Sequence, residues 1–166
     1  MNLDDNQENQ GPVQEIKTAE IAALIKEALE IMGVDSRVGV EQNVQGFTFN
    51  ISSPDSNLLI GQRGANLHAL QTLIHSIAYK RYGPTDRFTL DVDDYKKKRE
   101  WYLRETAKKA VEQLKRTGRP VALEPMPPHD RRVIHAFLSA DFDFETESIG
   151  EEPNRRIVIK PKEKGF

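Results

Sequence analysis

The sequence contains no cysteine, which excludes a disulfide framework and any zinc site built on cysteine thiolates. It also lacks an uninterrupted apolar run near the ~18 residues that a membrane-spanning helix needs. The first residues are acidic and lack the apolar segment of a secretory signal peptide. These absences favour a protein of the reducing cytoplasm that does not insert into a membrane.

The chain shows little net charge, because its formal charge of −2 is small for 166 residues. The charges are nevertheless unevenly placed. Residues 1–33 carry seven acidic side chains against Lys17 and Lys26, whereas residues 94–135 carry twelve lysines and arginines against six acids. The net charge gives no indication of a polyanionic partner, but the concentration of basic charge favours a local anion-binding surface.

Hydrophobic periodicity predicts two small α+β units. Residues 1–17 are polar and acidic, which predicts a disordered leader, and residues 161–166 are expected to form a flexible tail. The elements expected in the first unit are a helix at 18–32, strands at 38–44 and 47–51, a short helix at 58–60, a helix at 65–82 and a strand at 88–92. Those expected in the second unit are a helix at 94–117, a strand at 119–123, a helix from Pro127, and strands at 142–147 and 155–160.

Several apolar stripes support these helices. The stripe of the first helix consists of Ile21, Leu24, Ile25, Ala28 and Met32. The stripe of the long helix at 94–117 consists of Leu103, Ala107, Ala110, Val111 and Leu114. The helix after Pro127 is expected to bury Val133, Ile134, Phe137 and Leu138. Each stripe recurs at helical spacing, so one face of each helix should contact a core.

The motif Gly61-Gln62-Arg63-Gly64 stands between two predicted helices. Glycines three residues apart allow phosphates to approach the main chain, because neither contact point carries a Cβ atom. The helix that begins near Ala65 would direct its unpaired N–H groups and its positive dipole end at an anion in this loop. A nucleotide-binding P-loop is excluded, because Ala65-Asn66 stand where that loop needs Lys and Ser or Thr.

The segment Leu59-Ile60-Gly61-Gln62-Arg63-Gly64, followed by Leu67, Ala69, Leu70 and Gln71, resembles the K-homology (KH) motif, and the element order resembles the type II form of that domain. The resemblance covers residues 18–93. It implies a three-stranded sheet, and a loop in which Gly61, Gln62, Arg63 and Gly64 clamp the backbone of single-stranded RNA.

Arg131 and His135 are four residues apart on a predicted helix, so their side chains stand about 40° apart on one face and can contact one phosphate together. The segment from Pro125 to His135 resembles the R-three-H domain, over residues 94–160. That resemblance implies single-strand or phosphate contact by Arg131 and His135, with Arg132, Arg155 and Arg156 as basic neighbours.

A KH domain followed by an R-three-H domain resembles the Jag family of bacterial RNA-binding proteins. The resemblance implies RNA as partner, single-stranded DNA as a further candidate, partnership with a small single-domain KH protein, and roles in cell division, envelope control or sporulation. Members commonly carry an N-terminal Jag-N domain, in place of which this sequence shows the acidic leader. No catalytic residues, cofactor or metal follow from the resemblance.

One face of the helix at 94–117 carries a basic stripe within about 60°. Its members are Lys97, Trp101, Arg104, Lys108 and Lys115. Such cations can neutralise successive phosphates, and the tryptophan can stack on a base. The alternatives are a merely solvated charged face and a tryptophan packed against a neighbouring domain.

Two other functions are considered for the chain. A metal-dependent nuclease could use Asp91, Asp93 and Asp94, although no second motif of fixed spacing converges on them, and the pair His68 and His75 makes a poor metal site. An adaptor that contacts ribosomes or proteins is the second alternative. The residues, together with the function that the resemblance implies, favour a non-enzymatic protein that binds single-stranded RNA through both units.

Overall fold

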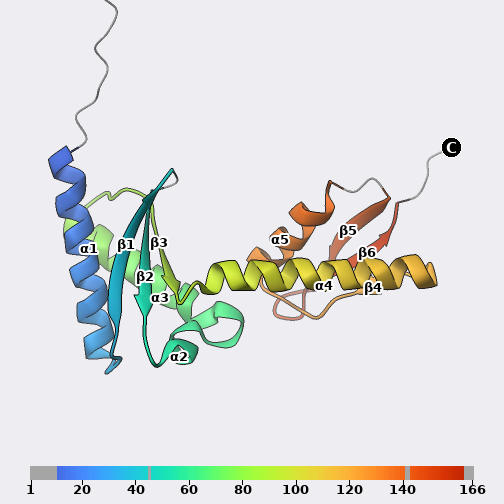
Figure 1. The fold of residues 1–166 in the computed structure, drawn as a ribbon, viewed down its shortest axis with the longest axis horizontal. Helices are drawn as coiled ribbons and strands as arrows, with labels where there is room; N and C mark the ends of the chain where they lie inside the picture. Colours follow the sequence, from blue (N-terminus) through green and yellow to red (C-terminus); the bar gives the residue numbers. More distant parts are fainter. Residues whose placement is uncertain (1–10, 45, 141–142, 163–166) are drawn as a thin grey trace, which may run out of the picture. The chain divides into compact units, whose positions relative to one another are not determined.

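The structure is a computed structural model that describes residues 11–44, 46–140 and 143–162 (Figure 1). Contacts within the chain divide it into two units, Met1–Tyr95 and Lys96–Phe166. Each unit contains one three-stranded sheet and its own cluster of buried apolar side chains. Among the described residues, no helix combines the length and the apolarity needed to cross a membrane.

The first unit has the helix-strand-strand-helix-helix-strand order of a type II KH domain, as the sequence predicts. Its elements are α1 (Gly11–Ile31), β1 (Arg37–Asn43), β2 (Gly46–Ser52), α2 (Ser56–Ile60), the 3-10 turn η1 (Gln62–Gly64), α3 (Ala65–Tyr82) and β3 (Phe88–Val92). Strand β2 lies in the centre of the sheet, antiparallel to β1 and parallel to β3.

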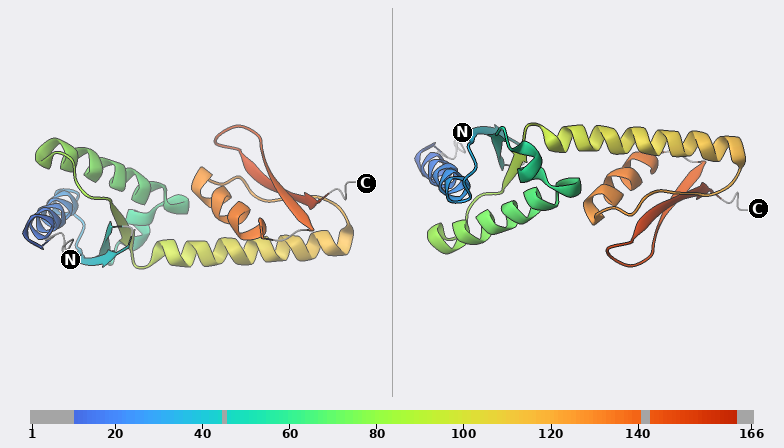
Figure 2. Two further views of the ribbon diagram at one scale, coloured as in Figure 1. Left: turned by 90° about the horizontal axis from the view of Figure 1, so that it is seen from above. Right: turned by 90° about the horizontal axis from the view of Figure 1, so that it is seen from below.

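The core of the first unit lies between the sheet and the helices α1 and α3, which cover the same face (Figure 2). Alternation along β2 and β3 places Phe49 beside Leu90 and Ile51 beside Val92, and all four side chains are buried. The opposite face of these strands carries polar residues, among them Thr48 and Thr89, whose hydroxyls lie 3.3 Å apart. Because β2 ends at Ser52 and α2 begins at Ser56, α2 and the loop that follows it lie near the end of the sheet at which β2 ends (Figure 1).

Helix α1 differs from the sequence-based expectation at both ends. It begins at Gly11, so residues 11–17 are helical where a disordered leader is expected, because extending an existing helix costs far less than starting one. Residues 1–10 lie outside the described part. The helix ends at Ile31, so Met32 falls in the turn and is 53% exposed, while Leu29, which the expected stripe omits, is fully buried.

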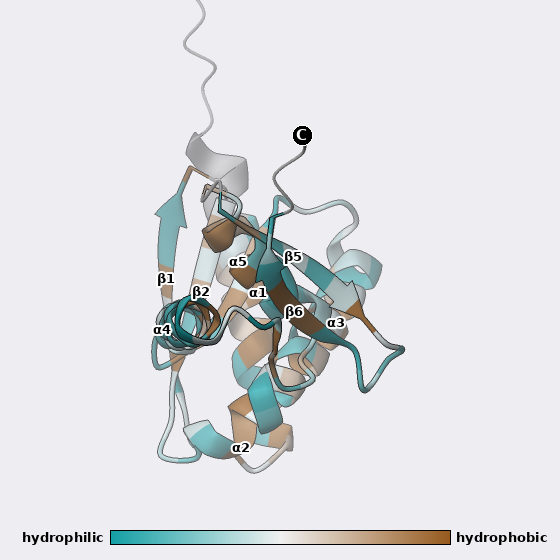
Figure 3. Cartoon of the chain, turned by 90° about the vertical axis from the view of Figure 1, so that its right-hand side faces the viewer, coloured by the Kyte–Doolittle hydropathy of each residue, from teal (hydrophilic) through white to brown (hydrophobic). Residues whose placement is uncertain are grey.

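The second unit packs two helices on an antiparallel sheet of order β4-β6-β5, as the predicted fold class requires. Its elements are α4 (Tyr95–Thr117), β4 (Val121–Ala122), α5 (Pro128–Leu138), β5 (Phe144–Ile149) and β6 (Arg156–Pro161). All five residues of the expected α4 stripe are buried. Strand β6 is coloured largely as hydrophobic in Figure 3, which agrees with its central position, whereas α4 is mostly hydrophilic outside its stripe.

The strands of the second unit are displaced from their expected positions. Strand β4 is shorter than 119–123, and β5 begins at Phe144, whose ring is buried, two residues later than expected. Pro161 pairs with Phe144 in β6, so the expected tail is partly strand. Residues 141–142 and 163–166 lie outside the described part. The alternating pattern of this segment fits either start, because positions two residues apart share a strand face.

The first strand of the hairpin ends one residue earlier than expected. Strand β1 ends at Asn43, so Val44 lies beyond it and is fully exposed, while the expected turn residue Gln45 lies outside the described part. Strand β1 is an edge strand with no buried position, which explains why its apolar alternation is weaker than that of β2.

Candidate nucleic-acid interface

The loop between α2 and α3 is held open by its backbone conformation. Gly61, Arg63 and Gly64 have φ values of 68°, 54° and 83°, all in the left-handed region. The amide of Gly64 donates to the carbonyl of Gly61, at 3.4 Å, and the amide of Gly61 donates to the carbonyl of Asn57 in α2. The side chains of Gln62 and Arg63 are exposed at the tip.

Both glycines of this loop are also required by their neighbours. A Cβ atom on Gly61 would lie 2.5 Å from Cγ of Asn66, and one on Gly64 would lie 2.8 Å from Cε1 of Tyr95. The Asn66 amide in turn donates to the carbonyl of Leu58, at 2.7 Å, which closes the loop across its base. The fold of the unit therefore demands glycine at both positions, whatever the loop binds.

Helix α3 begins directly behind the loop without a side-chain cap. Its N-cap residue is Gly64, which has no side chain to accept a hydrogen bond from the first turn. The first amides of a helix have no acceptor within the helix, and the helix dipole is positive at this end. The structure thus places the N-terminus of an 18-residue helix behind an exposed, left-handed loop with an arginine at its tip.

Arg131 is buried in the second unit. The residue is only 8% exposed. Its Nη1 donates to the carbonyl of Met126 and its Nη2 to Oε1 of Glu152, both at 2.6 Å. The preceding residue, Asp130, is buried and accepts two hydrogen bonds from Arg99 on α4, so the start of α5 is held from two sides.

His135 stands one helical turn further along α5 and is exposed. Its Nδ1 lies 2.5 Å from the hydroxyl of Thr146 on β5. This contact fixes the imidazole ring, and Nε2 is then the nitrogen available to an incoming group. Arg131 and His135 therefore lie on the same side of α5, but Arg131 is buried and His135 is exposed.

The three other predicted arginines occupy different surroundings. Arg132 is exposed on α5. Arg155, just before β6, donates from Nε to the hydroxyl of Ser148, at 3.0 Å. Ser148 and Thr146 point to the same side of β5, so Arg155 and His135 are anchored on neighbouring positions of one strand face.

Arg156 is directed to the other face of the sheet. It pairs with Ile149, and its neighbours Ile157 and Ile159 point into the core. The outer face also carries Lys160, whose hydrogen bonds to Glu147 and Glu145 raise its pKa. The two arginines are adjacent in the sequence, but the side chain of Arg155 is anchored on Ser148, whereas that of Arg156 lies on the opposite face of the sheet.

The basic stripe of α4 is present but partly compensated by acids. Arg104 pairs with Glu100 and Lys108 with Glu105 on the same helix. Arg104 also lies over the ring of Phe137, and Lys115 over the ring of Phe144, at 5.7 and 5.2 Å. Lys97 and Trp101 are exposed, the latter at 66%. Two of the five members are thus turned towards aromatic rings of their own unit.

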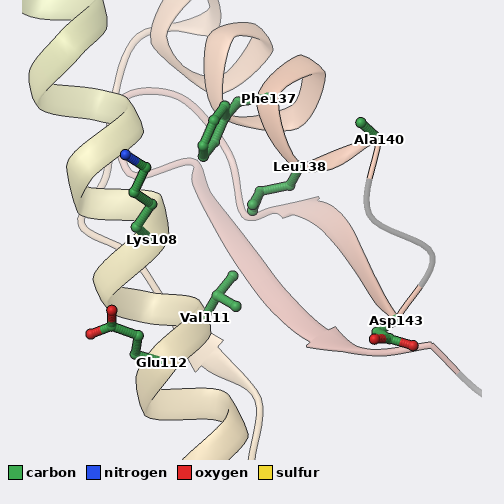
Figure 4. Close-up of a pocket in the computed structure, with 7 residues that line it drawn as sticks. All are labelled: Lys108, Val111, Glu112, Phe137, Leu138, Ala140 and Asp143. Carbon is green, nitrogen blue, oxygen red and sulfur yellow. The ribbon is translucent and has the colours of Figure 1, made fainter.

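A shallow cleft of about 600 Å³ lies beside this stripe (Figure 4). Phe137, Leu138 and Val111 form its apolar wall, and charged side chains stand at its edges. The full lining is Lys108, Val111, Glu112, Phe137, Leu138, Ala140 and Asp143.

Two of the residues considered for metal chemistry, Asp91 and His75, are engaged in the fold of the first unit. Asp91 is buried and accepts a hydrogen bond from the amide of Val92. His75 stacks on Phe88, with centroids 3.9 Å apart, and its Nε2 contacts the carbonyl of the same residue. Over the described ranges, no group of three or more histidine, aspartate or glutamate side chains is placed to hold a metal ion.

Several residues of this interface could not be identified from the sequence pattern. They are Thr146, Ser148, Glu152, Arg99 and Asp130. Thr146, Ser148 and Glu152 contact the predicted residues His135, Arg155 and Arg131. Arg99 and Asp130 pair with each other at the start of α5. The spacing of these residues carries no motif. An acidic residue directly before the motif arginine, such as Asp130, was the one local signal of a buried ion pair.

The second unit and the chain as a whole are similar to known proteins. Residues 102–161 match the model of the R-three-H domain. The chain is 38% identical over 131 residues to the RNA-binding protein KhpB of Clostridium symbiosum, covering 79% of this chain and 59% of that protein.

Two further relatives carry the same name. The chain is 34% identical over 154 residues to the RNA-binding protein KhpB of Bacillus subtilis, covering 91% of this chain and 71% of that protein. It is 32% identical over 139 residues to the protein of that name from Lactiplantibacillus plantarum, of which it spans 42%. With its type II KH order, its R-three-H domain and this similarity over most of its length, the chain belongs to the KhpB (Jag) family.

Proposed function

We propose that this protein binds single-stranded RNA without chemically altering it, through the Gly61–Gly64 loop and through the face of the second unit that presents His135, Arg132 and Arg155. The observation that carries the proposal is the loop: an exposed arginine and glutamine lie before a helix N-terminus that no side chain caps. Backbone amides, dipole and guanidinium all favour a phosphate at the same point. The names of the relatives support RNA as the ligand.

Phosphate contact at the loop supplies affinity without sequence preference. Base selection then requires contacts to base edges. The basic stripe of α4 with the exposed Trp101 is the candidate for tracking and stacking a strand, which adds affinity with little base preference. Within the family framework we further propose a cytoplasmic, bacterial post-transcriptional regulator. A small single-domain KH protein is the proposed protein partner, and single-stranded DNA is the ligand against which RNA selectivity is to be measured.

The loop is tested with the double variant Gln62→Asp and Arg63→Asp in the full chain. Two carboxylates at the tip repel phosphate, while the exposed side chains leave the core intact. We expect affinity for oligouridine to fall at least tenfold, the loss of about one charge-assisted hydrogen bond. Fluorescence anisotropy measures the affinity, and crosslinking with sequencing of RNA recovered from cells extends the comparison.

The matched control is the pair Arg37→Asp and Gln42→Asp, which makes the same substitutions on exposed positions of β1. It changes net charge equally and should weaken binding much less. Equal losses in both variants would mean that general electrostatics, and not the loop, holds the RNA. Retained binding to ribosomal subunits with no binding to oligouridine would favour the adaptor function instead.

A further inference from the structure

Arg131 differs from the other cations of the second unit in its surroundings. Its side chain is 9% exposed, compared with 51% for its partner Glu152. One nitrogen is used by a main-chain carbonyl, that of Met126, and another by the Glu152 carboxylate. A phosphate could reach this guanidinium only by displacing Glu152, and the displaced interactions would have to be replaced.

The two acceptors of Arg131 belong to segments that flank Arg155. Glu152 lies in the connection between β5 and β6, residues 150–155, here termed the β5–β6 loop. The amide of Met126 donates to the carbonyl of Arg155, at 3.1 Å. Arg131 therefore forms hydrogen bonds with Met126, whose amide donates to Arg155, and with Glu152, three positions before Arg155.

The β5–β6 loop has additional internal bonds but few apolar anchors. The amide of Asn154 donates to Glu151, and Gly150 adopts a φ of 91°, with Asn154 close to the position of a Cβ atom. Residues 150–156 are all exposed. Because the loop has no buried side chains, hydrogen bonds must hold its conformation. The buried residue that supplies such a bond to the loop is Arg131, through Glu152.

We propose that Arg131 is a positioning residue, which orders the β5–β6 loop and aims Arg155 at the RNA backbone without contacting the RNA itself. The inference rests on the proposed function of this face. It assigns the phosphate contact to Arg155 and to Nε2 of His135, which are anchored by Ser148 and Thr146 two residues apart on β5. Alternate residues of a strand are about 7 Å apart, so the two donors form a ladder along one strand face.

The first test is a double-mutant cycle between Arg131→Met and Arg155→Met, measured with oligouridine at several salt concentrations. If Arg131 acts through Arg155, each single variant should lose on the order of tenfold in affinity, and the double variant no more than either. The slope of log affinity against log salt should fall in magnitude by about 0.7 in all three, the loss of one phosphate. Additive losses, with a fall of about 1.4 in the double variant, would overturn the inference.

The second test asks whether Glu152→Ala weakens or strengthens RNA binding. Glu152→Ala removes a negative charge beside the RNA path, which by simple electrostatics strengthens binding, but it also releases Arg131. The inference requires weaker binding, by several-fold, whereas stronger binding would show that Glu152 masks an arginine that contacts phosphate. Glu151→Ala is the matched control, because it removes the same charge from the same loop without touching Arg131. It should bind RNA as well as the unaltered protein, or slightly better.

A third measurement needs no RNA and so separates this inference from the proposed function. Hydrogen exchange of the amides at Met126 and Asn154 should accelerate at least tenfold in Arg131→Met and in Glu152→Ala, while the amides of α4 stay protected. Unchanged exchange in the loop of both variants would overturn the positioning role. If loop exchange accelerates but the unaltered protein does not bind oligouridine, the proposed function fails and the positioning of Arg155 stands.

Discussion

At the scale of single residues, Gly61 and Gly64 have two physical reasons to be glycine. Both have positive φ, and a Cβ atom at either position would overlap Asn66 or Tyr95. A loss of RNA binding after substitution of a glycine would therefore not distinguish a lost phosphate contact from a distorted loop. The side chains at positions 62 and 63 are the informative ones, because they are exposed and make no part of the core.

The close contact between position 61 and Asn66 should change the free energy of unfolding when Gly61 is replaced. Gly61 and Gly83 share nearly the same backbone conformation, with φ/ψ of 68°/−173° and 75°/−157°, but no atom lies within 4 Å of a Cβ built on Gly83. Gly83→Ala should cost about 1–3 kcal/mol in unfolding free energy through backbone strain alone. Gly61→Ala should cost about 1 kcal/mol more, because Asn66 must release the carbonyl of Leu58.

Urea denaturation of both variants measures the difference between the two costs. Asn66→Ala serves as the control, since it removes the obstructing side chain: Gly61→Ala in that background should cost no more than Gly83→Ala. Equal costs for Gly61→Ala and Gly83→Ala in the otherwise unaltered protein would show that the contact with Asn66 has no energetic weight.

At the scale of elements, an ion pair on the surface of the first unit joins α1 to α3. Arg81 donates to Glu27 at 2.8 Å, and both side chains are about half exposed. The hydrogen bond and the charge of Arg81 lower the pKa of Glu27. A carboxyl group with a lowered pKa in the folded state stabilises the fold above its unfolded pKa, and this contribution is lost as pH falls through the folded pKa.

The corresponding prediction concerns acid conditions. Arg81→Gln should be slightly less stable than the unaltered protein at neutral pH, and the difference should vanish as the solution is acidified and Glu27 is protonated in both proteins. Urea denaturation over a pH series measures this, and NMR titration of the Glu27 carboxyl should show a higher pKa in the variant. Arg87→Gln, another exposed arginine of this unit, should show no such pH-dependent difference. A difference that persists unchanged in acid would contradict the assignment to Glu27.

At the scale of the whole molecule, two proposed phosphate sites stand on one chain. A strand long enough to occupy both is held by two contacts, and the second contact forms at a high effective concentration. We expect the affinity of the unaltered protein to rise by about 100-fold or more once the RNA reaches a threshold length. The double loop variant Gln62→Asp and Arg63→Asp should lose this rise, and so should Arg155→Met.

Oligouridines of increasing length, measured by anisotropy against both variants, test the prediction. Short strands should lose affinity only for the variant that alters the site they occupy. If each variant lowers affinity by the same factor at every length, the two units bind RNA independently, and the chain is a pair of separate binding modules.

The local pattern of the sequence determined much of the fold, because periodicity and helix signals act over a few residues. The α4 stripe is buried as expected, α3 begins at Ala65 behind the glycine loop, and the order of elements in both units agrees with the prediction. Errors occur at element ends, as with Met32 and Leu29, where a helix stops one residue earlier than its apolar spacing suggests.

Tertiary structure alone decided which of the predicted cations face solvent. The sequence predicts that Arg131 is a surface arginine one turn before His135. In the structure it is buried and donates hydrogen bonds to Glu152 and to the carbonyl of Met126. Arg155 and Arg156 are adjacent in the chain, yet Arg155 bonds to Ser148 on one face of β5, whereas Arg156 lies on the other face of the sheet. The physical reason is the same in each case: residue type and spacing specify the direction of a side chain on its own element, whereas its burial and its partners depend on segments that only the folded chain brings near.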